Sequence, residues 1–308
     1  PLLEELSGSI GAALQSQLGD LGSEDFTEID LQQPTLPGMP PEALIKQLMG
    51  MMGPMLLGMM AGSTAGHLAT RALGHYELPL PRPAHEPLTL VLRNVDEFAD
   101  DWTLPREAIR LWVCLSDVAH QHVLNLEHVR AHLDGLLGEY VSAFSQDPAE
   151  IERRMRGLGI DEDLGGSEPE LEALQRLAGD PDVLLSAMQS EAQLLLMPRI
   201  AAVVATVEGY VDWVLDTLGG RLIPEYDRVT EALRRRRAEA GPASRFVERL
   251  FGLELSQSTF DRGSLFVDGI VERSGTQALS QLWTDEAHLP TPAELDAPGL
   301  WLARVDIE

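Results

Sequence analysis

The residues of this sequence whose types and spacing could do chemistry are Ser116, Asp117 and His120. In the five-residue pattern H-E-x-x-H, two histidines one helical turn apart bind zinc and the glutamate activates a water molecule. Here His120 fills the second histidine position, serine stands at the first, and aspartate replaces the glutamate. From these five residues alone, a hydrogen-bonded core histidine beside a capped aspartate is the simpler interpretation, and a metal site is the alternative.

These side chains lie in the segment 105–128, which is predicted to be a helix. Pro105 suits the first turn of a helix, and the following residues are apolar on nearly every side, Cys114 included. A helix that is apolar all round is typical of a protein core. Asp117 and His120 are therefore expected to be carried inward. A buried carboxylate needs a counter-charge, a hydrogen-bond donor, a metal ion or a water-filled cleft.

A second candidate site lies in the segment 192–218, which is also predicted to be a helix. Its side chains are uncharged from Ile200 to Val207, and Glu208 follows directly. Asp212 is four residues further on, so Glu208 and Asp212 share one face of a helix. A carboxylate at the end of an apolar run could be a third metal ligand. It could equally pair with an arginine or cap a neighbouring helix.

Composition narrows the possible partners. The chain has 23 Lys and Arg residues against 49 Asp and Glu residues, a formal net charge of −26. Such a surface repels nucleic acid and anionic lipid, so neither is an expected partner, whereas an unidentified protein partner is possible. The sole cysteine, Cys114, excludes a disulfide framework and is expected to be a small core residue. The run 234–237, four arginines, is predicted to form a solvated helix face.

The chain is expected to contain an N-terminal arm or linker over 1–42 and one mostly helical domain over 43–308. An acidic, glycine-broken connection at 145–180 marks a possible boundary within that domain. The segment 42–75 is apolar enough to span a bilayer, but Pro54 and the lack of an aromatic belt favour a buried helix of a soluble protein. Residues 88–92 are predicted to form a strand. No secretory signal is recognised near the start, which favours a cytoplasmic location.

Several motifs taken together resemble a known family from about Met51 onward. They are GSTAG at 62–66, LGHYELPLP at 73–81, RLWV at 110–113, EGYVD at 208–212, GLEL at 252–255, LW at 282–283 and LPT at 289–291. The chain is similar to a mainly actinobacterial family of zincin-like proteins. Its members are described as hydrolases or zinc-dependent metalloproteases, and some are associated with the biosynthesis of a deazaflavin coenzyme.

The resemblance implies a mainly α, zincin-like fold with a small β-sheet beside the active-site helix. It also implies that His120 matches the second zinc ligand, Glu208 the third, and Asp117 the general base. Ser116 stands where the first ligand belongs, so no cofactor is expected unless the site still holds zinc.

Two hypotheses about function follow from this departure. The chain is either a catalytically inactive binding or scaffold protein, or an active metal-dependent hydrolase or peptidase with a rebuilt site. The rebuilt site would consist of His120 and Glu208 with Asp117 or Asp212. The loss of two motif residues favours the first hypothesis, which predicts that the purified protein lacks stoichiometric metal.

Overall fold

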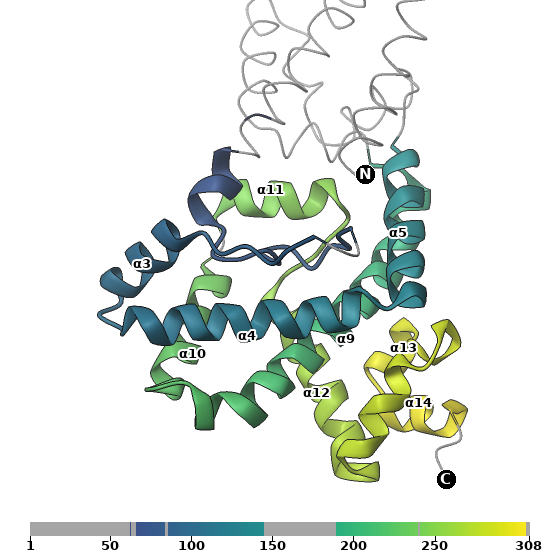
Figure 1. Cartoon of the computed structure of the whole chain (residues 1–308). Coiled ribbons are helices and arrows are strands. Elements are labelled where there is room, and N and C mark those ends of the chain that lie inside the picture. Colours follow the sequence, from purple (N-terminus) through teal and green to yellow (C-terminus); the bar gives the residue numbers. More distant parts are fainter. Residues whose placement is uncertain (1–61, 63–65, 84–85, 145–188, 240, 306–308) are drawn as a thin grey trace, which may run out of the picture. The chain divides into compact units, whose positions relative to one another are not determined.

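The structure is a computed structural model that describes residues 62, 66–83, 86–144, 189–239 and 241–305 (Figure 1). The chain divides into two compact units, and the described residues lie almost entirely in the unit formed by His67–Ser145 and Leu185–Glu308. The predicted arm at 1–42, most of the predicted helix at 42–75 and the connection at 145–180 lie outside the described residues. The domain boundaries therefore stay predictions.

The described part of the chain is mainly helical, as predicted. The helices labelled in Figure 1 are α3 (Leu92–Asp101), α4 (Arg106–Leu124), α5 (Glu127–Ser142), α9 (Glu191–Leu222), α10 (Tyr226–Ala238), α11 (Pro242–Leu250), α12 (Gln257–Ser274), α13 (Pro292–Leu295) and α14 (Pro298–Val305). Two 3₁₀ helices, η1 (Thr276–Trp283) and η2 (Glu286–His288), connect α12 to α13. The predicted helix 105–128 ends earlier than expected, because Asn125 caps α4 and α5 starts two residues later.

The core is built around the 32-residue helix α9, which packs against α4, α5 and α12. Ser190 begins α9 with a capping box, in which its hydroxyl accepts the Gln193 N–H and the Gln193 side chain accepts the Ser190 N–H. By length and composition α9 could cross a membrane. Most of its apolar stretch is instead buried by the other helices of the same unit, as in the core helix of a soluble protein.

Helices α9 and α12 touch through their backbones at Gly209 and Gly263. A Cβ atom on Gly209 would lie 2.2 Å from the Gly263 carbonyl carbon, and one on Gly263 would lie 2.0 Å from the Ala205 oxygen. Only glycine permits such an approach. Glu208 directly precedes Gly209 in α9, so this contact fixes the position of the backbone that carries Glu208.

The predicted strand at 88–92 and the small β-sheet are wrong for the described residues, which contain no strand. Residues 86–91 run without regular structure, and α3 begins at Leu92. The Val91 N–H donates to the Leu73 carbonyl over 2.9 Å. The preceding prolines, at 79, 81, 83 and 87, have no N–H to offer a ladder, so this segment cannot supply a regular pairing partner.

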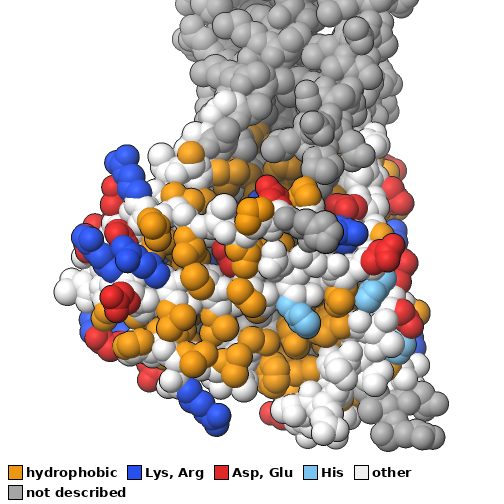
Figure 2. Space-filling view, in the orientation of Figure 1, with side chains coloured by type: hydrophobic (Ala, Val, Ile, Leu, Met, Phe, Trp, Pro, Cys, Tyr) orange, Lys and Arg blue, Asp and Glu red, His pale blue; other side chains and the backbone are white. Residues whose placement is uncertain are grey.

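Helix α4 is less buried than its composition predicts. Its inner face is covered, but Leu111 is 40% and Val118 53% exposed, and Cys114 is exposed as well. The prediction that Cys114 belongs to the core is therefore wrong. Hydrophobic side chains gather on the face of the molecule that is turned to the viewer, where α4 runs across it (Figure 2). Sequence periodicity cannot distinguish a helix covered on one side from one covered all round.

Candidate functional site

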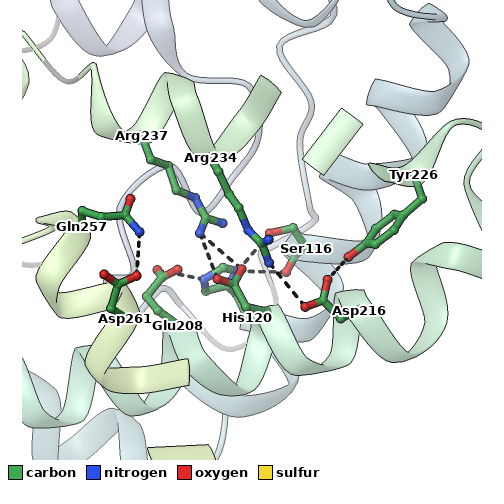
Figure 3. A network of polar contacts seen from close by, with 10 residues as sticks. Ser116, His120, Glu208, Asp216, Tyr226, Arg234, Arg237, Gln257 and Asp261 are labelled. Carbon is green, nitrogen blue, oxygen red and sulfur yellow. Dashed lines mark hydrogen bonds and ion pairs between the residues drawn. The ribbon is translucent and has the colours of Figure 1, made fainter. Parts of the chain in front are cut away.

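Helices α4 and α9 bring His120 and Glu208 together, although 88 residues separate them (Figure 3). The His120 Nε2 atom lies 3.2 Å from Glu208 Oε1, and both side chains are buried. The other ring nitrogen, Nδ1, lies 2.9 Å from the Ser116 carbonyl oxygen. Burial disfavours the protonated ring, but the Glu208 carboxylate outweighs it and raises the pKa of His120. The direction of this shift favours an imidazolium beside the Glu208 carboxylate.

Arg237 of α10 completes this cluster of charges (Figure 3). Its Nη1 atom lies 3.2 and 3.3 Å from the two carboxylate oxygens of Asp212. Burial raises the pKa of Glu208, yet the charges of His120 and Arg237 together lower it below its usual value. Burial raises the pKa of Asp212, and the charge of Arg237 offsets part of that effect. Two basic and two acidic side chains thus face one another here. We define His120, Glu208, Asp212 and Arg237 as the charge cluster.

The prediction of a solvated arginine face over 234–237 holds for only half of the run. Arg234 and Arg235 are exposed, whereas the other two arginines turn inward. Arg236 pairs with Glu77 over 2.7 Å. The guanidinium of Arg237 lies 4.8 Å from the Phe260 ring centre and 5.8 Å from that of Trp112. Four consecutive residues cover a whole helical turn, so they cannot all face solvent on a packed helix.

Asp117 lies beside this cluster but is bound to the backbone. Its Oδ2 atom accepts the His75 N–H over 2.7 Å, and its Oδ1 atom accepts the Tyr76 N–H over 3.0 Å. Burial raises the pKa of Asp117, and the two hydrogen bonds offset part of that effect. A Cβ atom on Gly74 would lie 2.4 Å from Asp117 Oδ2, so the loop approaches the carboxylate as closely as glycine allows. The sequence left open whether a counter-charge, a hydrogen-bond donor, a metal ion or a water-filled cleft compensates the buried Asp117 carboxylate. In the structure, backbone hydrogen-bond donors compensate it.

A cavity of about 120 Å³ opens beside the charge cluster. Ser116, Asp117, His120 and Glu208 line one wall, together with Trp112. The lining also includes polar groups from other elements that the sequence analysis did not identify, among them His67, Arg71, Ser244 and Glu248. Ser244 and Glu248 share α11, but His67 is 177 residues from Ser244, so only the fold reveals that these side chains line one cavity.

Comparison with known proteins places the chain in a family. A family model described as zincin-like metallopeptidase matches residues 3–302. The chain belongs to the zincin-like metallopeptidase family. The fold of this zincin-like chain is similar to the crystal structure of a putative hydrolase with a novel fold from Chloroflexus aurantiacus, with a TM-score of 0.59 and 22% sequence identity over 99% of this chain and 90% of that one. No curated protein matches the sequence.

Membership of the zincin-like family implies zinc, but the residues at this position do not fit the ion. A zinc site normally has three or four protein ligands. His120 and Glu208 are the two candidates brought together, and Ser116 stands in the place of a ligand. Across the described ranges, no group of three or more His, Cys, Asp or Glu side chains is arranged to hold a metal ion. The roles assigned to Asp117, His120 and Glu208 stay predictions, whereas their proximity is a fact of the structure.

Proposed function

We propose that this zincin-like chain has no zinc-dependent activity at α4 and works as a binding or scaffold protein. The observation that supports the proposal most strongly is the charge cluster. His120 and Arg237 supply the positive charge that the carboxylates of Glu208 and Asp212 require. A zinc ion would have to displace a proton from His120 and work against the field of Arg237.

The chemistry of His120 supports the same proposal. Its Nδ1 atom faces a carbonyl oxygen and its Nε2 atom faces a carboxylate oxygen, so both nitrogens act as hydrogen-bond donors. A metal-binding imidazole must keep one nitrogen free of a proton. Binding zinc would therefore break the contact with Glu208.

The alternative is an active hydrolase with a rebuilt metal site, using His120 and Glu208 with Asp117 or Asp212. Each of the two aspartates already has partners. Asp117 holds two backbone N–H groups, and Asp212 pairs with Arg237. Recruiting either one to a metal would leave those donors or that guanidinium without a partner in a buried place, which is costly.

Metal content tests the proposal. Untagged protein, purified without chelator, is measured by elemental mass spectrometry before and after exposure to zinc and removal of the excess. We expect well below about 0.1 zinc per chain in both states, against about one for an intact site. About one zinc per chain, lost in His120→Ala or Glu208→Ala but kept in His122→Ala, would overturn the proposal. His122 is an exposed histidine on the same helix and serves as the matched control.

Further expectations accompany this proposal. With a net charge of −26, a partner protein with a basic surface is the complementary class. A cytoplasmic location, an actinobacterial source and a link to deazaflavin-coenzyme biosynthesis remain predictions from the sequence and its resemblance. Metal-free protein that binds no partner would leave the binding hypothesis without support.

A further inference from the structure

We infer that Ser244 and His67 form a metal-independent nucleophile–base pair that can accept an acyl group from a small carboxylic ester in the cavity. This inference goes beyond the proposed function and does not depend on how α4 lost its zinc motif. It concerns the part of the cavity lining that His67 and α11 supply.

The geometry of the pair is that of an activated serine. Ser244 Oγ lies 2.7 Å from His67 Nε2, although 177 residues separate them. A nucleophile and its base must lie about 2.6–3.2 Å apart for the proton to pass between them. Both residues line the cavity and both are partly exposed, so a substrate can reach them.

The electrostatic surroundings keep His67 in the form that a base needs. Burial lowers the pKa of His67, and the charge of Arg71 lowers it further, against a smaller opposing effect of Glu77. The imidazole is therefore neutral near pH 7 and can take the hydroxyl proton. Ser244 also lies in the first turn of α11, where Gly241 provides no side-chain cap for the backbone N–H groups. Such N–H groups stabilise a negative oxygen that develops nearby.

Trp112 and three apolar side chains of the lining suit a ligand with an acceptor oxygen and a small apolar group. The indole N–H of Trp112 is buried and has no hydrogen-bond partner among the residues that the structure describes, and Trp112 is only 6% exposed. Buried donors in proteins normally have a partner, so this one suits a carbonyl oxygen of a bound molecule. Leu68, Val247 and Leu255 supply apolar surface in the same cavity.

The reaction conserves atoms and charge with no further reagent than water. Ser244 Oγ attacks the ester carbonyl carbon while His67 Nε2 takes the hydroxyl proton. The tetrahedral intermediate then expels the alcohol, which receives that proton from His67, and the acyl group stays on Ser244. A water molecule, deprotonated by His67, attacks the acyl-serine, releases the carboxylic acid and restores the hydroxyl.

Two probes test the pair in the presence of excess EDTA. A fluorophosphonate is incubated with the full chain, and the labelled residue is located by peptide mass spectrometry. Hydrolysis of p-nitrophenyl butyrate is followed across pH. We expect one label, on Ser244. We also expect a fall of about 100-fold or more in hydrolysis in Ser244→Ala and in His67→Gln, as for loss of a general base. The rate of the unchanged chain should fall as His67 becomes protonated in acid.

Ser280→Ala is the matched control, because the Ser280 hydroxyl is exposed and donates only to the nearby Gln277 carbonyl. No label on the folded, unchanged chain, or labelling spread equally over surface serines, would overturn the inference, and this readout needs no variant to fold. The hydrolysis assay is repeated without EDTA. Hydrolysis that is present only without EDTA and that His120→Ala removes would overturn both this inference and the proposed function. Absence of a label on metal-free protein would overturn this inference alone.

Discussion

The ionisable groups on the two sides of the cavity differ in how deeply they are buried and how they are paired. On the α4 side, His120 pairs with Glu208, and Arg237 pairs with Asp212. Asp117 accepts two backbone N–H groups on the same side. On the α11 side, Ser244 and His67 form a hydrogen bond with each other. Burial on that side raises the pKa of Glu248 to about 7.

This difference indicates which wall can still react. A group that is fully paired in a buried place contributes to stability and has little freedom to exchange protons or ligands. A half-buried serine beside a neutral imidazole, and a carboxyl that titrates near pH 7, keep that freedom. We therefore regard the α4 wall, where the family motif stands, as structural, and the α11 wall as the reactive one. The following experiments test this comparison.

The largest effect is expected from Glu208→Ala. Removing one partner of a buried ion pair leaves an uncompensated charge, here His120 with Arg237 nearby, and typically lowers the free energy of unfolding by about 3–5 kcal/mol. Urea denaturation measures the change. Glu286→Ala is the matched control, because Glu286 also pairs with a histidine, His132, over 2.8 Å but is 63% exposed. It should lower stability by less than about 1 kcal/mol. Equal losses in the two variants would contradict a structural role for the α4 wall.

A smaller but still large effect is expected from Asp117→Ala. The backbone N–H groups of His75 and Tyr76 lose their acceptor, which should lower the free energy of unfolding by about 3 kcal/mol. Ser244→Ala changes the other wall, where the side chain is partly exposed, and should lower stability by about 1 kcal/mol or less. The two urea midpoints are compared directly. If Ser244→Ala destabilises the fold as much as Asp117→Ala, the contrast between the walls is wrong.

The smallest effect concerns pH. A raised pKa of His120 gives stability that is fully present below the ordinary value of 6.5 and is lost as the pH rises through the raised value. A lowered pKa of Glu208 gives stability that is present above 4.5 and is lost as the pH falls through the lowered value. The pair should therefore stabilise the fold most between about pH 4.5 and 6.5 and less at pH 8.5.

The double variant His120→Gln, Glu208→Gln isolates this contribution. Titrations of other groups, such as Glu248, occur in both proteins and cancel in the difference. Unfolding free energies are measured at pH 5.5 and 8.5. The unchanged chain should lose more stability between these values than the double variant does. Identical losses would show that His120 and Glu208 do not form an ion pair.

Much of the local structure was predictable from the sequence. The apolar segment 105–128 predicted α4, and the uncharged run 200–207 followed by Glu208 predicted α9. The strand predicted at 88–92 was wrong because branched residues favour a strand only where a partner strand is present. The inward orientation of Arg237 was missed because four consecutive arginines give no sign of which one faces the core.

The sequence by itself determined that Ser116 and Asp117 depart from the zinc motif, and it predicted that Asp117 and His120 are carried inward on a core helix. These are properties of residue type and helical period, which act over a few residues. Only the tertiary structure decided that Asp117 binds a loop, that Arg237 pairs with Asp212 and that Ser244 meets His67. Each of these contacts joins segments far apart in the chain, and packing between helices, rather than any local pattern, places their side chains together.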